Sequence, residues 1–304
     1  MKDPPFQKHR KLWMSVLGVL CILLAVAFSV YPLVSNYLAE KNKSLVCTAY
    51  TETVEELDDS NIQTMLKEAQ EYNAALAPGT ISMDGTFSQD ALLAAAEDYY
   101  DLLTVNEAGI MGYVEIPKIE VYLPIYHGTE EDVLSIGVGH LLGSTLPVGG
   151  DSTHTVLTGH SGLASEKMFS DLDQLTEGDV FYLHALEEVL AYEVDEIHVV
   201  LPEDTSHLGI TKGEDYCTLI TCTPFGVNTH RLLVRGTRIE YIPEEETTED
   251  TEVIHEAESV RSTWQEQYIK GVLIALIVVF ASGVCIILVC HFKRPRKRGK
   301  HERG

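Results

Sequence analysis

Two long hydrophobic runs lie near opposite ends of the chain. Residues 12–34 and residues 271–290 contain no charged side chain. A helix that rises about 1.5 Å per residue needs roughly 20 apolar residues to cross a bilayer, and both runs reach that length. The first run is long for the apolar part of a cleaved signal peptide, which is the alternative, and no small-x-small cleavage motif follows it cleanly. The pattern therefore predicts two transmembrane helices.

The segment after the first run has helical periodicity. Apolar positions between Ile62 and Leu76 recur at helical spacing behind a capping box formed by Ser60 and Gln63. The Ala-Pro-Gly sequence at 77–79 ends this helix, and Ser88 is the expected N-cap of a second helix over residues 91–103. We therefore predict a helical extension over residues 35–108.

From residue 109 the pattern changes to short strands separated by glycine and proline. Seven runs are strand-like, namely residues 113–117, 121–125, 155–158, 180–183, 190–194, 218–222 and 232–239. Many short strands with such turns predict a mainly β domain, a sandwich or a barrel, over residues 109–242. Residues 243–270 are rich in Glu and Thr and are expected to form a solvated acidic linker.

The distribution of charge predicts how the chain is oriented in the membrane. The formal net charge is −24, from 22 Lys and Arg against 46 Asp and Glu, which disfavours nucleic acid as a partner. Residues 1–11 nevertheless hold four basic side chains against one acidic, and residues 291–304 hold seven against one. Because basic residues beside spanning helices stay in the cytoplasm, both ends are predicted to be cytoplasmic. The chain would then cross the cell membrane twice, with residues 35–270 outside.

The six cysteines indicate a free thiol outside the membrane. Three of them lie in or beside the hydrophobic runs, and the three others are Cys47, Cys217 and Cys222. An odd number suggests a reactive thiol, although a Cys47–Cys217 disulfide stays open. The sequence has no CxxC metal pair and no phosphate-binding glycine loop, so no metal and no cofactor is expected.

Cys222 is the candidate nucleophile. It closes the strand-like run 218–222 immediately before Thr223 and Pro224, where a thiol would be held by a strand yet remain accessible. The alternative is a buried structural cysteine, a common fate of this residue type. Cys217 fits that alternative better, since it lies on the opposite face of the strand by the two-residue period.

Arg231 is the candidate cation beside Cys222. It lies nine residues further on, after a loop rich in turn residues and at the start of the next strand-like run. A hairpin of the two runs would place the side chains next to each other, where a guanidinium favours a thiolate or donates to an oxyanion. Arg235 is the competing residue on the same run.

His160 is the candidate acid–base. It follows the run 155–158 within the sequence Gly-His-Ser-Gly, whose glycines allow a close approach to another segment. The chain has twelve histidines, and His140, His154 and His230 are the alternatives.

These motifs resemble those of the sortase family. Residues 218–222 read TLITC and resemble its TLxTC signature, residues 158–160 read TGH and resemble its histidine motif, and Arg231 falls at its arginine position. The similarity extends over residues 109–241, through segments 116–119, 137–141 and 146–150. Residues 222–231, the helical extension and the second hydrophobic run resemble the class C, pilin-polymerising sortases in particular.

The resemblance implies a closed eight-stranded barrel with Cys222, His160 and Arg231 in a surface groove. It implies a cysteine transpeptidase that cleaves a Leu-Pro-x-Thr-Gly-like sorting signal of a pilin or surface protein through a thioacyl intermediate. His160 would protonate the leaving amine, and Arg231 would hold the substrate backbone and stabilise the oxyanion. In class C the acceptor is a lysine amine of another pilin, and the product is a covalent pilus.

The sequence departs from the class at two points, and two other functions stay open. Ser161 stands where the class often has arginine. The class also has an Asp-Pro-aromatic lid, and the corresponding residues here are Asp84 and Phe87. A glycine and a threonine stand between them in place of the proline, and the glycine makes the segment more flexible. These two residues are candidate lid residues, with an ordinary loop as the alternative. The alternatives to pilus assembly are a housekeeping sortase that uses a cell-wall precursor and an inactive surface-tethered scaffold.

Overall fold

The computed structural model describes residues 5–76, 99–106, 109–161 and 167–243. They all belong to the first of two compact units, Met1–Glu256, and the second unit, Ala257–Gly304, lies outside the described residues. The predicted second membrane helix at 271–290, the basic tail and nearly all of the acidic linker therefore lie outside them. The same holds for Asp84, Phe87 and the predicted N-cap at Ser88.

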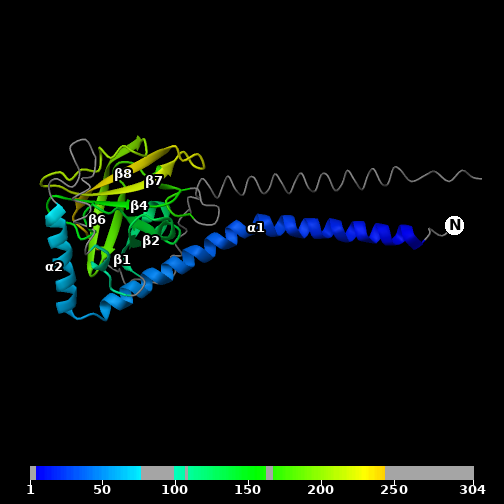
Figure 1. Cartoon of the computed structure of the whole chain (residues 1–304), viewed down its shortest axis with the longest axis horizontal. Helices are drawn as coiled ribbons and strands as arrows, with labels where there is room; N and C mark the ends of the chain where they lie inside the picture. The colour runs from blue at the N-terminus through cyan, green and yellow to red at the C-terminus, as the bar shows by residue number, and fades with distance from the viewer. Residues whose placement is uncertain (1–4, 77–98, 107–108, 162–166, 244–304) are drawn as a thin grey trace, which may run out of the picture. The chain divides into compact units, whose positions relative to one another are not determined.

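Helix α1 is one continuous helix of 51 residues, Pro5–Glu55 (Figure 1). Its segment Leu20–Glu55 reaches a mean hydropathy of 1.8 and is long and apolar enough to cross a membrane, a test that a signal sequence also passes. No other helix among the described residues passes it. The sequence predicts a membrane helix over 12–34 followed by a helical extension, and α1 runs through both, past Pro32, without a break. A proline inside a helix removes one backbone hydrogen bond locally and does not have to end the helix.

The last turns of α1 pack on the barrel. Cys47, Tyr50 and Val54 are buried there. The hydroxyl of Tyr50 donates a hydrogen bond to the carbonyl of Met111 at 3.2 Å and accepts one from the backbone N–H of Leu186 at 2.8 Å. A buried aromatic ring with a satisfied hydroxyl ties the helix to two separate barrel segments.

Helix α2, Asp59–Leu76, covers another part of the barrel. It begins at Asp59, so Ser60 lies in the first turn and not at the predicted N-cap. The residues predicted to end this helix, 77–79, lie outside the described residues. Asn73 is buried and makes two hydrogen bonds with Leu146: its Nδ2 donates to the Leu146 carbonyl, and its Oδ1 accepts from the Leu146 N–H.

Eight strands form a closed barrel, which confirms the mainly β class and the strand number. Its order is β1-β2-β3-β4-β7-β8-β6-β5. The strands are β1 (Ile110–Ile116), β2 (Val121–His127), β3 (Val138–His140), β4 (Thr153–Thr158), β5 (Val180–Ala185), β6 (Glu188–Val200), β7 (Asp215–Thr223) and β8 (His230–Ile239). The short helices are η1 (Tyr99–Asp101), η2 (Pro117–Ile119), α4 (Glu131–Leu134) and η3 (Leu172–Gln174). The strand that periodicity misses is β3, because three fully buried residues show no alternation.

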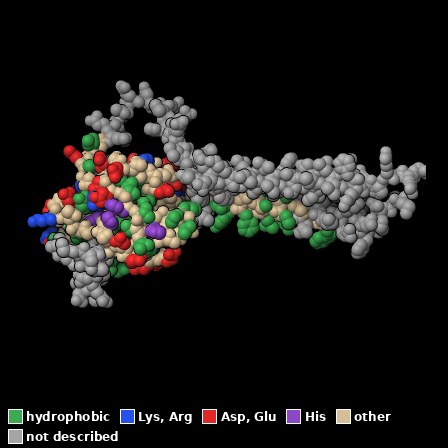
Figure 2. Space-filling model, turned by 90° about the horizontal axis from the view of Figure 1, so that it is seen from above, with side chains coloured by type: hydrophobic (Ala, Val, Ile, Leu, Met, Phe, Trp, Pro, Cys, Tyr) green, Lys and Arg blue, Asp and Glu red, His purple; other side chains and the backbone are tan. Residues whose placement is uncertain are grey.

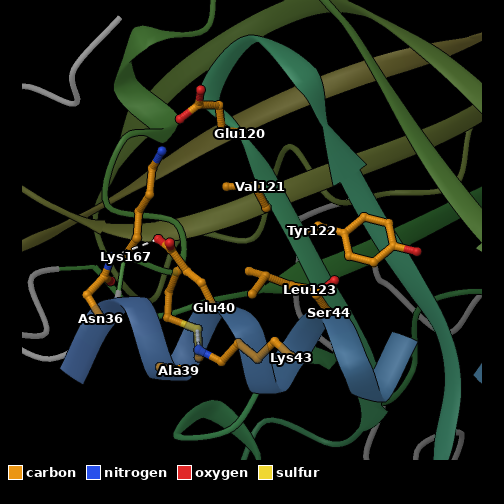
Figure 3. A pocket seen from close by; sticks show the side chains of 11 residues that line it. Asn36, Ala39, Glu40, Lys43, Ser44, Glu120, Val121, Tyr122, Leu123 and Lys167 are labelled. Carbon is orange, nitrogen blue, oxygen red and sulfur yellow. Dashed lines mark hydrogen bonds between the residues drawn. The ribbon is translucent and has the colours of Figure 1, made fainter. Parts of the chain in front are cut away.

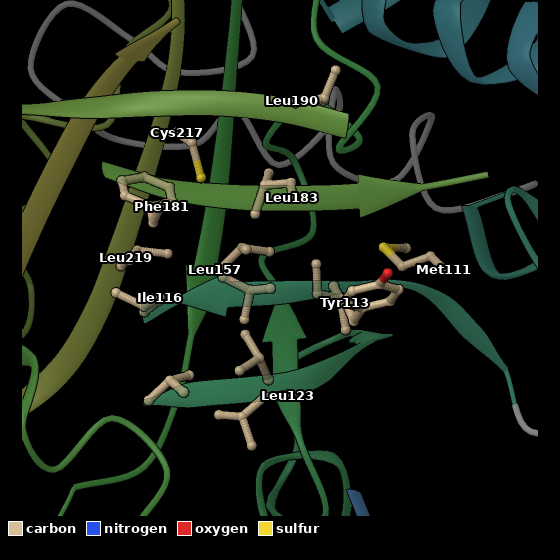
Figure 4. Close-up of a cluster of buried hydrophobic side chains, with 14 of the residues drawn as sticks. Met111, Tyr113, Ile116, Leu123, Leu157, Phe181, Leu183, Leu190, Cys217 and Leu219 are labelled. Carbon is tan, nitrogen blue, oxygen red and sulfur yellow. The ribbon is translucent and has the colours of Figure 1, made fainter. Parts of the chain in front are cut away.

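The inside of the barrel is filled by large apolar side chains. Figure 4 shows part of this cluster, in which Leu157, Phe181, Leu183 and Leu219 are each 0% exposed. Cys217 belongs to the same cluster and is a free thiol, as is Cys47. The disulfide between them that the sequence leaves open is therefore not formed.

A second, smaller core lies on the other side of the sheet wall. It consists of Val156, Val200, Leu208, Ile220 and Leu233, which come from β4, β6, the β6–β7 loop, β7 and β8. Because side chains alternate along a strand, Ile220 and Cys222 share the outer face while Cys217 and Leu219 share the inner one. This parity places the candidate nucleophile on the outside of the barrel.

Candidate active site

The β7–β8 hairpin brings Cys222 and Arg231 together. The two strands are antiparallel, and Cys222 pairs directly with Arg231 in the register. Residues directly opposite in such a pair have side chains on the same face, about 5 Å apart at Cβ. Cys222 is partly buried, one residue before the end of β7. The predicted hairpin is confirmed.

The guanidinium of Arg231 is held by backbone carbonyls. Its Nη1 donates to the carbonyl of His230 at 3.1 Å and to that of Asn228 at 3.4 Å. Among the described residues it has no carboxylate within salt-bridge distance. Its positive charge is therefore not neutralised by this part of the chain, and the register pairs its residue with Cys222.

Arg235, the competing arginine, is fully engaged elsewhere. Its Nε and Nη2 donate to the two carboxylate oxygens of Asp195 at 3.1 and 2.7 Å, and Nη2 also lies 2.8 Å from Glu196. Its guanidinium lies 4.2 Å from the ring centroid of Tyr216. In the register it pairs with Thr218 and not with Cys222. Of the two arginines, Arg231 is therefore the one that the register places opposite Cys222.

His160 lies two residues after the end of β4, in a loop that is bonded to β7. The N–H of Gly159 donates to the carbonyl of Ile220 at 3.0 Å, and the Oγ1 of Thr221 donates to the carbonyl of Gly159 at 2.8 Å. These bonds attach the histidine loop to the two residues before Cys222. A Cβ on Gly159 would come 2.6 Å from the ring of Phe169, so glycine is needed for this close approach.

The His160 ring is mostly enclosed, with 21% of its side chain exposed. Its Nε2 is buried and has no hydrogen-bond partner in the described structure, and Oε1 of Glu131 lies 3.3 Å away. Glu131 begins the short helix α4 and its side chain is 84% exposed. Sequence patterns do not single out Glu131, because the contact joins segments 29 positions apart and no local spacing announces it.

The alternative histidines have structural roles. His140 is 0% exposed and its two ring nitrogens contact the hydroxyl of Tyr99 and the carbonyl of Thr145. His154 contacts the carbonyl of Gly209 and the hydroxyl of Thr218. Burial lowers the pKa of each of these histidines to about 4, so both are neutral at physiological pH. His230 is opposite Thr223 in the register, and its ring contacts Thr229.

A pocket lies elsewhere, between α1 and β2 (Figure 3). Its lining includes Lys43 of α1 and Lys167 of the barrel. The ammonium of Lys167 donates to the carbonyl of Ile119 and lies 3.5 Å from Asp171, while that of Lys43 lies 2.8 Å from the sulfur of Met168. Lys43 thus links the helix to the barrel part, Lys167 is bonded within the barrel part, and the pocket contains none of the three predicted catalytic residues.

The family comparison agrees with the site. A sortase-domain family model matches residues 114–239. Sortase A of Streptococcus agalactiae is 30% identical over 141 residues, which cover 45% of this chain and 54% of that protein. Sortase D of Bacillus subtilis is 33% identical over 131 residues, which cover 42% and 63%. The chain thus spans less than two thirds of the length of these curated relatives.

Solved structures match over a longer stretch. Sortase C1 of Streptococcus agalactiae is 46% identical with a TM-score of 0.59, covering 65% of this chain and 99% of that one. Sortase C of Streptococcus pneumoniae is 44% identical with a TM-score of 0.57, covering 66% and 99%. Sortase C of Clostridium perfringens, solved with its C-terminal cell wall sorting motif, is 43% identical with a TM-score of 0.56, covering 65% and 100%. The resemblance to sortases, and to their class C, is confirmed.

Proposed function

Because the chain belongs to the sortase family, we propose that it is a pilin-joining cysteine transpeptidase in which Cys222, His160 and Arg231 are the catalytic residues. The observation that carries this proposal is the direct register pairing of Cys222 with Arg231, next to a histidine loop bonded to the same strand. The similarity to class C structures supports pilins as substrates, since one of those structures concerns pilin substrate specificity.

The first acyl transfer cleaves the sorting signal. The Cys222 thiolate attacks the carbonyl carbon of the signal's threonine in a Leu-Pro-x-Thr-Gly-like sequence, and a C–S bond forms. The oxyanion accepts hydrogen bonds from Arg231, a role supported by the pairing of Arg231 with Cys222 in the strand register. The C–N bond to glycine then breaks, and His160 gives its proton to the leaving amine.

The second acyl transfer releases the enzyme. A lysine amine of another pilin attacks the thioester carbon, and its proton passes to His160 while the C–S bond breaks. The product is an isopeptide bond between pilins, and Cys222 returns as a thiolate. A docked lysine reacts as an intramolecular nucleophile, an advantage of roughly 7–11 kcal/mol over a free amine when orientation is good.

The test uses the full chain in detergent, mixed with a pilin that carries its sorting signal. We expect a ladder of heat-stable covalent multimers that disappears when the acceptor lysine is replaced by arginine. Transfer only to a cell-wall-precursor amine, without multimers, would favour the housekeeping alternative. If no thioacyl adduct forms on Cys222, the result would favour the alternative that the protein is an inactive surface-tethered scaffold.

We further propose that the enzyme crosses the cell membrane twice, with the barrel outside. The apolar segment of α1 and the uncharged run 271–290 with its basic tail support this topology. Protease added to intact protoplasts should digest the barrel region and spare a tag at either terminus. A C-terminal tag that is degraded from outside would contradict it.

The lid role of Asp84 and Phe87 stays a prediction.

A further inference from the structure

We propose that Glu196, His198 and His207 form a binding site for a transition-metal dication such as zinc, on the outer face of the barrel. The ligating atoms of these three residues all lie within 4.8 Å of one another. Each side chain is partly buried and so remains reachable from solvent. Neither spacing nor a cysteine pair points to this site in the sequence, because His207 comes from a loop.

Strand β6 presents the first two ligands. Glu196 and His198 are two positions apart and therefore lie on the same face of the strand. The Nε2 of His198 lies 3.0 Å from Oε2 of Glu196. A register shift between Val194 and Glu196 in the β6–β8 pairing comes immediately before this pair. Such a bulge re-aims the side chains that follow it.

The loop between β6 and β7 supplies the third ligand at a fixed position. Leu208, the next residue, is 3% exposed and packs in the outer core with Val200 and Ile220. On the other side, the N–H of Ser206 donates to the carboxylate of Asp204. The ring of His207 stacks on that of His198 with their centroids 3.9 Å apart. The third ligand is therefore held over the first two by a buried neighbour.

Glu196 is held in place by two neighbouring side chains. Its Oε2 lies 3.0 Å from the Nε2 of His198. The Nη2 of Arg235 lies 2.8 Å from Oε1, which leaves Oε2 facing the imidazoles. Arg235 is itself fixed by Asp195. Outer-sphere partners of this kind orient carboxylate ligands in metal sites.

The ligand types select the metal. Two imidazole nitrogens and one carboxylate oxygen suit zinc, with water completing a four-coordinate site, whereas calcium prefers six to eight oxygen ligands. The chain offers a matched comparison in His184 and Glu115, whose Nε2 and Oε2 lie 3.1 Å apart. That pair has no third ligand grouped with it among the described residues.

A bound metal would tie the β6–β7 loop to β6 beside the catalytic hairpin. Val200, two residues after His198, pairs with Arg231 in the register, and the loop begins directly after it. In the view of Figure 2, histidine side chains reach the surface of the barrel part among acidic ones. Metal binding at this place lies beyond the proposed transpeptidase activity and does not depend on it.

The test titrates zinc chloride into the tag-free full chain in detergent, in a Cys222→Ala background that removes the partly buried thiol as a competing ligand. We expect one zinc ion per chain assigned to this site, and a cobalt substitute with the absorption of a four-coordinate complex. His198→Gln and His207→Gln should each weaken this binding by at least about tenfold, a loss of the size seen when even outer-sphere partners are removed. His184→Gln should leave it unchanged.

Two results would overturn the proposal. One is the absence of stoichiometric zinc binding in the parent chain, which needs no variant to interpret. The other is binding that His198→Gln and His207→Gln leave intact, which would place the ion on histidines elsewhere. Protease cleavage within residues 201–214 provides a second readout, since zinc should slow it in the parent and not in His207→Gln.

Discussion

The barrel wall formed by β4, β7 and β8 contains the same three residue types twice. The first group, called the middle group, lies within the strands and consists of Cys217, His154 and Arg235. The second, called the end group, lies at or just beyond the strand ends and consists of Cys222, His160 and Arg231. In the middle group every polar side chain is buried or paired with a neighbour. In the end group the thiol is partly exposed and the arginine pairs with no carboxylate of the described residues.

The two groups differ in position and surroundings and not in residue type. Burial raises the pKa of Cys217 well above its ordinary range, so its thiol stays protonated and inert. His154 is kept neutral by burial, and Arg235 is neutralised by Asp195. Cys222 lies five positions after Cys217 on β7, and because this number is odd the two thiols lie on opposite faces of the strand. Cys222 also lies close to the end of the strand. Substitutions at matched positions can therefore test this comparison.

The largest effect is expected at the two cysteines. Cys222→Ala should abolish cleavage of a fluorescent sorting-signal peptide, because no other thiol faces the site in the described structure. Cys217→Ala should keep the activity per folded molecule and lower the free energy of unfolding by about 1–2 kcal/mol, for a small cavity in the core. Loss of activity in Cys217→Ala with normal unfolding would contradict the assignment.

The next effect is expected at the two histidines. His160→Ala should lower kcat by about 10²–10⁴, the usual contribution of a general acid–base. His154→Gln is the matched control and should affect stability, since it disturbs a buried hydrogen-bonded group, while the rate per folded molecule stays near that of the parent. Stopped-flow cleavage of the peptide, corrected for folded fraction, measures both. A His160→Ala rate within tenfold of the parent would remove this residue from the mechanism.

Substitution of the two arginines should likewise have different effects, on the rate for Arg231 and on stability for Arg235. Arg231→Ala should lower kcat by about 10²–10³, as loss of an oxyanion donor does, and Arg231→Lys should recover only part because lysine lacks the planar fork. Arg235→Ala should destabilise the fold by about 1–3 kcal/mol through the unpaired Asp195, with little change in rate. Equal rate losses in the two alanine variants would show that the hairpin acts as a unit.

A smaller effect is expected where the histidine loop is fastened to β7. Thr221→Val removes the hydrogen bond to the Gly159 carbonyl, worth about 1 kcal/mol, so kcat should fall about fivefold while KM changes little. Thr218→Val removes the hydroxyl that contacts His154 and should leave kcat unchanged. An unchanged kcat in Thr221→Val would mean that the loop needs no such fastening.

The smallest effect at neutral pH is the acid sensitivity of the buried histidines. Their folded-state pKa of about 4 lies below the unfolded value near 6.5, so below pH 6.5 the unfolded chain binds more protons. Stability should thus be constant above pH 6.5 and fall by a few kcal/mol as the pH drops toward 4. Urea midpoints at pH 7 and pH 5 measure this, and His154→Gln should reduce the change. Identical midpoints in the parent would refute it.

Much of this site can be predicted from the sequence, because its residues are local. Cys222 and Arg231 belong to one hairpin with a turn-rich loop, and strand parity alone is enough to separate Cys222 from Cys217. His160 is harder, since its flanking glycines mark it out but only the resemblance to a family separates it from His140, His154 and His230. The burial of those two histidines depends on contacts with Tyr99 and with Gly209, at distant positions in the chain.

Other features could not be predicted because they depend on long-range contacts. Glu131 approaches His160 from a short helix between β2 and β3, and His207 meets His198 only because Leu208 is buried in the outer core. The strand β3 is too short to show a period. The sequence analysis predicts helix on both sides of residue 34 but does not establish that α1 is one continuous helix, which the structure shows.

Because α1 is continuous, it sets the distance between the first hydrophobic run and the barrel. From the end of the first hydrophobic run at residue 34 to Cys47, where α1 packs against the barrel, an unbroken helix measures about 20 Å at 1.5 Å per residue. A flexible tether of the same number of residues would let the barrel sample many heights and tilts above the lipid surface. If residues 12–34 span the membrane as proposed, a stiff helix would instead set the distance between the membrane and the barrel by its number of residues. Lengthening it by one turn should raise the barrel by about 5 Å, and the enzyme would then prefer sorting signals that emerge correspondingly further from their own membrane anchors.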